Sequence, residues 1–221
     1  MFVLVLDTST PAVTTGVVDV GSAPEVIDSR VVVEARRHGE VLAPQIAASL
    51  VAAGLAVTDL TAVVAGVGPG PFTGVRVGLA TAAAVALTAE LPTYAVCSLD
   101  AISARVAGAG VLVATDARRR EVYWAVYDDG VRRAGPDVAT PGDLAARLGA
   151  VEVWTMVGPG AREYADAFGL PLAGGGDYPG VRELAILAAD RIRSGAASEA
   201  LVPLYLRRPD AVPPRDVVQP E

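Results

Sequence analysis

The chain has 221 residues, enough for one large domain or two small ones; 52% of them are hydrophobic and only 5% are aromatic. A net charge of −7 argues against binding nucleic acid by bulk electrostatic attraction, and the few aromatic side chains offer little surface for stacking bases. All 18 basic residues are Arg, which excludes lysine-dependent chemistry: a Walker phosphate-binding loop, a Schiff base and a Ser–Lys dyad. The single Cys97 and single His38 exclude an internal disulfide, a Cys-based zinc site and a paired-His metal site.

The two longest apolar segments do not predict a secreted or membrane protein. The first apolar run, Phe2–Leu6, meets Asp7 after five residues and is no signal peptide. The longest run of low polarity, residues 77–89, is too short to span a bilayer. We therefore expect a cytoplasmic protein without membrane contact.

The first half of the chain predicts a strand, two further closely spaced strands, and then alternating helices and strands. The apolar run that ends at Asp7 is typical of a buried strand with a functional group at its end, and the two strands after it predict an antiparallel meander. The expected elements are strands at residues 2–7, 13–20, 26–34, 61–67 and 93–97, and helices at 40–53, 73–90 and 99–106.

The same pattern restarts after Gly108–Gly110. Strands are expected at residues 111–116, 121–128, 136–139 and 151–157, and helices at 140–148, 161–168 and 179–193, with Thr140 as the N-cap of the first of these helices. Two units that each open with an apolar strand capped by Asp predict an internal duplication. We expect an α/β fold of two lobes, residues 1–107 and 108–221, the second ending in a flexible Pro- and Arg-rich tail.

The densest signal is the glycine-rich stretch from Gly66 to Gly78. Gly68 and Gly70 permit a tight turn, Thr73 is a good N-cap for the helix that follows, and Arg76 lies in its first turn. A helix N-terminus with free N–H groups attracts phosphate or carboxylate. The alternative is a rigid turn that packs the helix on its sheet.

Small residues recur at every fourth position of that helix, which aligns them into one ridge: Gly74, Gly78, Ala82 and Ala86. Such a ridge lets another backbone approach closely. It predicts either packing against the sheet of its own lobe or an interface with a second chain.

Polar residues follow both Asp-capped strands, in Asp7-Thr8-Ser9-Thr10 and in Asp116-Ala-Arg118-Arg-Arg120. In a duplicated fold these turns would face each other across a cleft, where Asp can hold a hydrated magnesium ion and Ser or Thr can bind phosphate. The alternative is a pair of ordinary turn-starting Asp residues beside solvated arginines. The lone His38, beside two arginines, is typical of a surface or interface position.

Together these segments resemble the TsaB family, the non-catalytic partner in forming N6-threonylcarbamoyladenosine in tRNA. The matching stretches are Leu6–Thr10, Arg37-His38 with Glu40, the glycine-rich segment 66–78, Asp116–Arg119 with Glu121–Trp124, and Pro203–Arg207. They extend from the first strand to the tail.

The resemblance implies a fold of two actin/Hsp70-like (ribonuclease H-like) lobes and an accessory role. It implies pairing with a larger catalytic homologue, TsaD, which carries the metal and the chemistry, and cooperation with the ATPase TsaE. ATP, magnesium and tRNA would then be engaged at the level of the complex, and the isolated chain could pair with itself. No catalytic or metal-binding residue is assigned to this chain. The implied interface residues are His38, Gly74, Arg76, Gly78, Ala82 and Ala86; the candidate nucleotide- or anion-binding residues are Asp7, Thr8, Ser9, Gly68, Gly70, Thr73, Asp116 and Arg118.

Two positions depart from the family pattern. Pro71 stands where Ser is usual, which removes an N–H and a hydroxyl, and Gly39 stands where Ser usually follows the His. Both departures argue against nucleotide binding by this chain alone. The turn at Asp7 also lacks the glycine that lets phosphate approach in active kinases of this fold.

Two other functions compete with the accessory role. A small-molecule kinase or ATPase of the same fold would use Asp7, Asp116 and the turn at Gly68–Gly74 around Mg-ATP. A metallopeptidase has no support from the residues, because the chain has one His and no HExxH motif.

Overall fold

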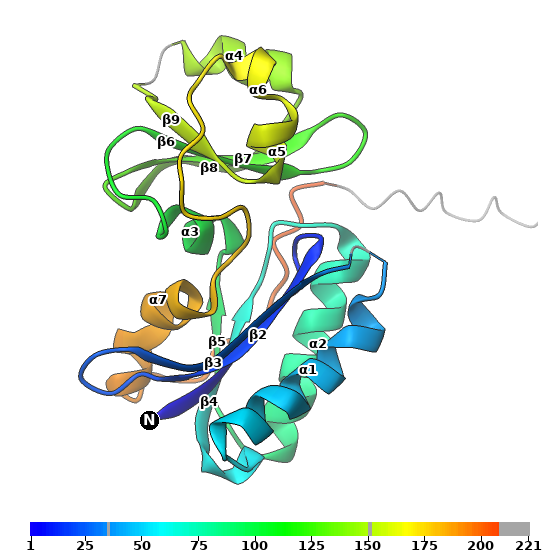
Figure 1. Cartoon of the computed structure of the whole chain (residues 1–221), viewed down its shortest axis with the longest axis vertical. Coiled ribbons are helices and arrows are strands. Elements are labelled where there is room, and N and C mark those ends of the chain that lie inside the picture. The colour runs from blue at the N-terminus through cyan, green and yellow to red at the C-terminus, as the bar shows by residue number, and fades with distance from the viewer. Residues whose placement is uncertain (35, 150–151, 208–221) are drawn as a thin grey trace, which may run out of the picture.

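The computed structural model describes residues 1–34, 36–149 and 152–207, which form two α/β lobes stacked along the long axis of the molecule (Figure 1). The flexible end predicted for the tail falls on residues 208–221, outside the described residues. No helix in the described ranges combines the length and the apolar character needed to cross a membrane.

Each lobe is built on one mixed sheet, and the two sheets share a topology. The first has the order β3-β2-β1-β4-β5 and the second β8-β7-β6-β9. In each, the opening strand pairs antiparallel with the next strand of a meander and parallel with a later strand. The duplication predicted from the pattern is confirmed. The strands are β1 (Phe2–Asp7), β2 (Ala12–Asp19), β3 (Glu25–Val33), β4 (Leu60–Gly66), β5 (Thr93–Val96), β6 (Val111–Asp116), β7 (Val122–Asp128), β8 (Val131–Ala139) and β9 (Thr155–Val157).

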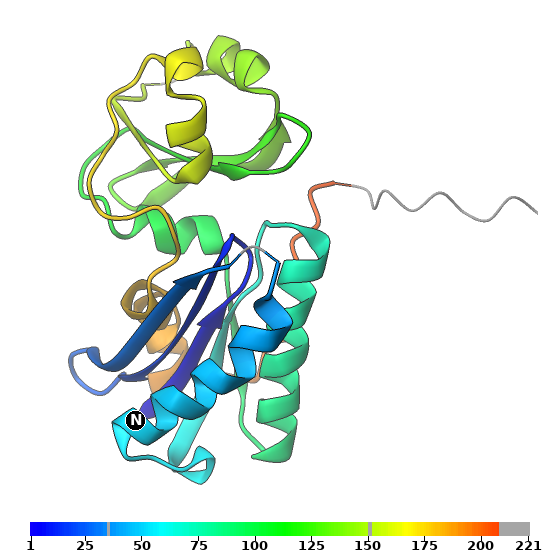
Figure 2. The same cartoon turned by 45° about the vertical axis from the view of Figure 1, so that its right-hand side comes forward.

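Helices cover both faces of the first sheet because its central strands are apolar on both sides. One face packs against α1 (His38–Ala53) and α2 (Phe72–Thr88), through side chains such as Leu42, Leu50 and Leu79. These two helices run beside each other along the sheet (Figure 2). The other face packs against α7 (Val181–Arg193), whose Leu184 and Ala188 are fully buried.

The chain therefore returns to the first lobe after it has built the second. Beyond α7, Glu199 N–H donates to the Thr93 carbonyl and Leu204 N–H to the Val67 carbonyl, both at the first sheet. The division at residue 107 stays a prediction. A C-terminal segment packed on the N-terminal sheet is a long-range contact that no local pattern encodes.

The remaining helices belong to the connection and to the second lobe: α3 (Ser98–Ser103), α4 (Pro141–Leu148), α5 (Pro159–Glu163) and α6 (Ala165–Phe168). Thr140 is the N-cap of α4, as predicted, and its hydroxyl accepts from Asp143 N–H. The single helix expected at residues 161–168 is wrong: Tyr164, at φ −112° and ψ 30°, leaves the helical conformation and separates α5 from α6. The strand expected at 151–157 is shorter, and its first residue lies outside the described residues.

Candidate functional site

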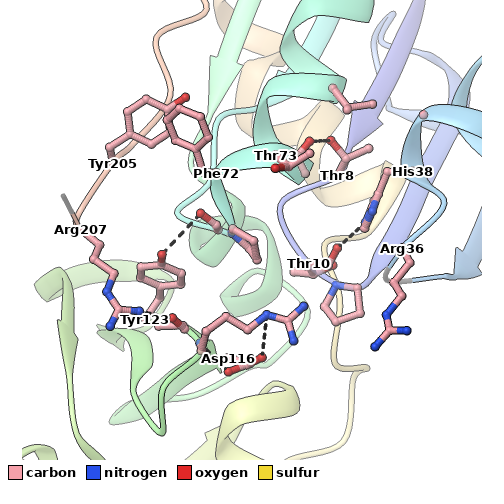
Figure 3. Close-up of a pocket in the computed structure, with 18 residues that line it drawn as sticks. Thr8, Thr10, Arg36, His38, Phe72, Thr73, Asp116, Tyr123, Tyr205 and Arg207 are labelled. Atoms are coloured by element: carbon pink, nitrogen blue, oxygen red, sulfur yellow. Dashed lines mark hydrogen bonds and ion pairs between the residues drawn. The ribbon is translucent and has the colours of Figure 1, made fainter. Parts of the chain in front are cut away.

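A cleft of about 500 Å³ lies between the lobes, where the turns after β1 and β6 approach the start of α2 (Figure 3). Five of the eight predicted binding residues line it, together with two residues that were assigned to a partner interface. The predicted residues that line it are Thr8, Gly70, Thr73, Asp116 and Arg118, joined by His38 and Gly74. The duplicated strand ends do face each other across one cleft.

Asp7 does not reach this cleft. Its side chain is fully buried and accepts hydrogen bonds from the Ser98 hydroxyl, from the Ser9 hydroxyl at 2.8 Å and from the Ser9 N–H at 2.8 Å. A Cβ at Gly66 would overlap the Asp7 carboxylate, so the end of β4 also presses on it. Asp7 is therefore held as a structural carboxylate away from the cleft, and its binding of nucleotide or magnesium together with Asp116 stays a prediction.

Burial also shifts the pKa of the Asp7 carboxyl. Loss of water raises the pKa of the Asp7 carboxyl above its ordinary value of 3.8, although the hydrogen bonds from Ser98 and Ser9 act in the opposite direction. The folded chain thus holds this proton to a higher pH than the unfolded chain does. Ser9 and Gly68 stay out of the cleft as well, since Ser9 is buried and Gly68 N–H donates to the Ser98 hydroxyl.

Asp116 lines the cleft, and its carboxylate is already bound by Arg118 of the same turn. Its carboxylate accepts from Arg118 N–H at 2.7 Å and lies 3.7 Å from Arg118 Nε. Arg118, Arg119 and Arg120 all have positive φ, a backbone conformation uncommon for non-glycine residues, so this turn is tightly constrained. Within the described ranges no group of three or more His, Cys, Asp and Glu side chains is arranged to hold a metal ion.

Helix α2 begins one residue earlier than predicted, and its N-cap lies two residues before the predicted one. The helix begins at Phe72, Pro71 occupies the N-cap position, and no side chain caps the helix. Thr73 lies inside the first turn and is not the N-cap, because Pro71 already has the extended conformation (φ −57°, ψ 133°) that precedes a helix. The second departure from the family pattern, Gly39, has open space around its Cβ position.

The ridge of small residues faces its own sheet. Gly74, Gly78, Ala82 and Ala86 are all buried, and a Cβ at Gly78 would lie 2.3 Å from Thr8 Oγ1. The Thr8 hydroxyl donates to the Gly74 carbonyl at 2.7 Å, which holds the helix against the β1 turn. These four residues therefore pack on their own sheet, the first of the two alternatives, and their assignment to a partner interface stays a prediction.

Arg76 and His38 are also engaged within the chain. The Arg76 guanidinium lies 3.7 Å from the centroid of the Phe72 ring, and its Nε donates to the Tyr205 hydroxyl at 2.7 Å. His38 Nε2 lies 2.9 Å from the Thr10 carbonyl, an acceptor, so this nitrogen carries the proton. Their assignment to a partner interface stays a prediction.

The C-terminal segment forms a wall of the cleft that the sequence did not assign. Tyr205 stacks on Phe72 with ring centroids 5.0 Å apart. Arg207 donates to the Ala117 carbonyl at 2.9 Å and ion-pairs with Glu121 at 2.8 Å, so it joins the first lobe to the second. Pro203–Arg207 stood out as a motif, but nothing local predicted that it would meet residues about a hundred positions earlier.

Comparison with known proteins places this geometry in a family. The family model described as TsaD, tRNA N6-adenosine threonylcarbamoyltransferase, matches residues 31–153. A protein of Mycobacterium tuberculosis is 46% identical over 96% of this chain and 94% of its own length. Escherichia coli TsaB, a tRNA threonylcarbamoyladenosine biosynthesis protein, is 32% identical over 94% of this chain and 95% of its own. The chain belongs to the TsaB family.

The fold agrees with that assignment. YeaZ from Pseudomonas aeruginosa superposes with a TM-score of 0.75 at 29% identity, covering 93% of this chain and 99% of that one. The two actin/Hsp70-like lobes expected from the resemblance are confirmed. Both strand-end carboxylates, Asp7 in the core and Asp116 at the cleft, accept hydrogen bonds from the chain itself.

Replacing Asp7 by Asn tests its buried ionisation. Because the folded pKa of Asp7 is raised, ionisation costs stability as pH rises through the raised value, whereas Asn cannot ionise. We expect the free energy of unfolding of Asp7→Asn, measured by urea titration, to increase relative to the parent chain between pH 4 and pH 8.

Asp19→Asn is the matched control with the opposite sign. Asp19 accepts from the N-terminal ammonium at 2.8 Å, which lowers its pKa, so its carboxylate stabilises the fold above about pH 4 and that contribution is lost as pH falls. A difference between Asp7→Asn and the parent that stays constant with pH would contradict the account of Asp7.

Gly78→Ala tests which way the ridge faces. On an exposed helix face this change would stabilise the isolated chain by about 1 kcal/mol, through helix propensity. Against Thr8 the added methyl group overpacks, and we expect a loss of about 1–3 kcal/mol in the free energy of unfolding. Gly39→Ala, in the first turn of α1 with open space around it, is the control and should be neutral or stabilising. Stabilisation by both changes would show that the ridge at Gly78 is not packed against Thr8.

Proposed function

We propose that this chain is the accessory subunit in formation of N6-threonylcarbamoyladenosine in tRNA, and that it binds a TsaD-type transferase through the outward face of α1 and α2. Membership of the TsaB family and the match to a TsaD family model support the pathway and the partner. The observation that carries the proposal is the apolar outer surface of these two helices, which lacks charge from Val41 onward in α1 and everywhere but Arg76 in α2.

That surface contrasts with the rest of a chain in which 19% of residues are charged. From Val41 to Ala53, α1 has no charged residue, and the only one in α2 is Arg76, which packs on Phe72 and Tyr205. Among large apolar side chains of the described residues, Leu87 on α2 and Val51 on α1 are the most exposed, at 82% and 80%. Exposed apolar patches free of charge are typical of protein interfaces.

The geometry of the two helices suits a helical partner. They lie side by side along one face of the sheet (Figure 2), so both present their outward sides to the same partner. A groove of about 990 Å³ lies between α2 and residues 198–205, and Ala83 and Leu87 line it together with the charged Glu90 and Glu199. Small exposed residues such as Ala47 and Ala84 would let the partner's helices approach closely.

In this proposal the catalytic step and the metal belong to the partner. Asp7 is sealed in the core and Asp116 is paired with Arg118, so the chain contributes binding and positioning. The TsaE-type ATPase and tRNA would be engaged by the assembled complex, in the cytoplasm where tRNA is modified.

The kinase or ATPase alternative draws on the same cleft. Thr8, Gly70 and Asp116 line it, as that function needs, but Asp7 is withdrawn from it. Calorimetric titration of the purified chain with Mg-ATP separates the two functions: the accessory role predicts no turnover, and micromolar binding with hydrolysis would favour the kinase.

Charged substitutions on the helix face test the proposal directly. We expect Val51→Glu and Leu87→Glu each to weaken capture of the TsaD-type homologue in a pull-down with purified proteins by at least about tenfold, because each buries a carboxylate in an apolar interface. Both side chains are exposed, so circular dichroism should show an unchanged fold.

Val131→Glu is the control, an exposed valine on β8 of the second lobe that should leave capture unchanged. Unaltered capture by both helix variants would place the interface elsewhere. Absence of any capture by the parent chain would overturn the partner itself.

A further inference from the structure

Helix α3 lies at the junction where the chain passes from the first lobe to the second. The Ser98 hydroxyl at its start donates to the Asp7 carboxylate of the first lobe. On the other side, Leu99 and Ile102 pack on the second sheet. α3 therefore contacts both lobes at the first crossing of the chain.

The chain returns to the first lobe through residues 174–180, which lie against the end of α3. Arg105 Nη1 donates to the Tyr178 carbonyl at 3.2 Å, and a Cβ at Gly175 would lie 2.7 Å from the Arg105 carbonyl. Neither crossing lines the cleft. Two neighbouring crossings at one side of the junction form a hinge, because the lobes can rotate about them without stretching either one.

At the cleft, the lobes are held by hydrogen bonds and an ion pair. The Tyr123 hydroxyl reaches the Gly70 carbonyl over 3.4 Å, which is long for such a bond. Arg207 bonds more closely, at 2.9 Å to the Ala117 carbonyl and 2.8 Å to the Glu121 carboxylate. The side chains of this ion pair are only 23% and 29% exposed, so separating them costs more than separating an exposed pair.

Arg207 is attached to the first lobe by the strap, a name used here for residues 203–207. The Leu204 N–H donates to the Val67 carbonyl at 2.9 Å, and the Leu204 side chain packs on the core beneath α1 and α2. The Tyr205 ring stacks on Phe72 (Figure 3). The strap thus starts on the first lobe and ends on the second.

Tyr205 is shared by two cavities. It lines the cleft between the lobes, and it also lines the groove between α2 and residues 198–205. Arg76, which lines the groove, donates to the Tyr205 hydroxyl at 2.7 Å and lies over the Phe72 ring at 3.7 Å. The position of Tyr205, and of Arg207 two residues later, therefore depends on a side chain in the groove.

We propose that the strap is a latch: Arg207 holds the two lobes closed about the hinge at α3, and Arg76 fixes the strap from the groove through Tyr205. In the closed state Arg207 binds Ala117 and Glu121, and in the open state all three groups bind water. A ligand that displaces Tyr205 from the groove side favours the open state. This inference does not depend on the proposed function, because every contact of the latch lies within the chain.

Distances between spin labels on the two lobes test the latch. The labels are placed at Ala47→Cys on α1 and Asp166→Cys on α6, both exposed, in a Cys97→Ser background common to every variant. We expect one narrow distance for the parent. Arg207→Ala removes two charge-assisted bonds and should raise the fraction of molecules at longer distances at least about tenfold.

Reversing the ion pair tests the specific contact. Arg207→Glu and Glu121→Arg each place like charges together and should open the lobes, whereas the two changes combined restore an ion pair and should recover most of the closed distance. Arg133→Ala, which breaks an exposed ion pair with Asp128 inside the second lobe, is the control and should match the parent. A combined variant as open as either single change would show that the ion pair does not close the lobes.

The link to the groove is tested by two variants that leave Arg207 intact. Arg76→Ala removes the side chain in the groove, and Tyr205→Phe removes only the hydroxyl to which Arg76 donates. Both should shift the distances in the same direction as Arg207→Ala. Neither should add to the effect of Arg207→Ala, because all three changes act through the strap.

Two results would overturn the proposal. Parent-like distances in Arg207→Ala would show that the strap does not hold the lobes together. A shift in Arg76→Ala with parent-like distances in Tyr205→Phe would assign the effect to α2 itself and contradict the link from groove to latch. Circular dichroism spectra that match the parent should accompany every variant, since each change leaves the two cores intact.

Discussion

The buried carboxylate of Asp7 links the central strands of the first lobe to the helix that leads into the second lobe. It lies at the end of β1, accepts from Ser9 in the following turn, contacts the backbone of Gly66 at the end of β4, and accepts from Ser98 at the start of α3. α3 in turn leads the chain into the second lobe and packs Leu99 and Ile102 against β6. One side chain therefore connects two neighbouring strands to the passage between the lobes. A carboxylate committed to these contacts cannot also serve a substrate in the cleft.

The close approach of α2 to the β1 turn follows from the same constraint. Thr8 is held next to Asp7, and only glycine at positions 74 and 78 lets the helix backbone approach it. Because the small residues are used on this inner face, the outer face of α2 is formed by alanines, Leu87 and the packed Arg76. The packing that buries the glycine ridge against the sheet thus leaves the uncharged side chains of α2 on the surface beside α1. In a TsaB family member this surface is the reason for proposing a binding role.

Much of the fold was predictable because strands and helices of this chain have strong local signals. The apolar runs that end at Asp7 and Asp116, each followed by a meander, predicted both sheets and their duplication. The direction of the ridge was not predictable: in a helix as rich in Ala as α2, small residues occur on every side, and only the position of Thr8 decides which side is buried. Arg76 bonds to Tyr205 across 129 positions of sequence, and α7 packs on the sheet that begins the chain, so neither contact has a local signature. Asp7 has the position typical of a site residue, at the end of a buried strand. Its partner Ser98 lies 91 residues away in the sequence, so the hydrogen bond that holds Asp7 in the core has no local signature.

The central claim is that this chain acts through its helical surface and not through chemistry in its cleft. Reconstituted formation of threonylcarbamoyladenosine on tRNA, with the purified TsaD-type transferase and its ATPase, tests this claim when Asp116→Ala and Leu87→Glu variants of the chain are compared at equal concentration. The account predicts that Asp116→Ala supports modification at close to the parent rate and that Leu87→Glu does not. Loss of modification with Asp116→Ala in a folded chain, together with full activity of Leu87→Glu, would contradict it.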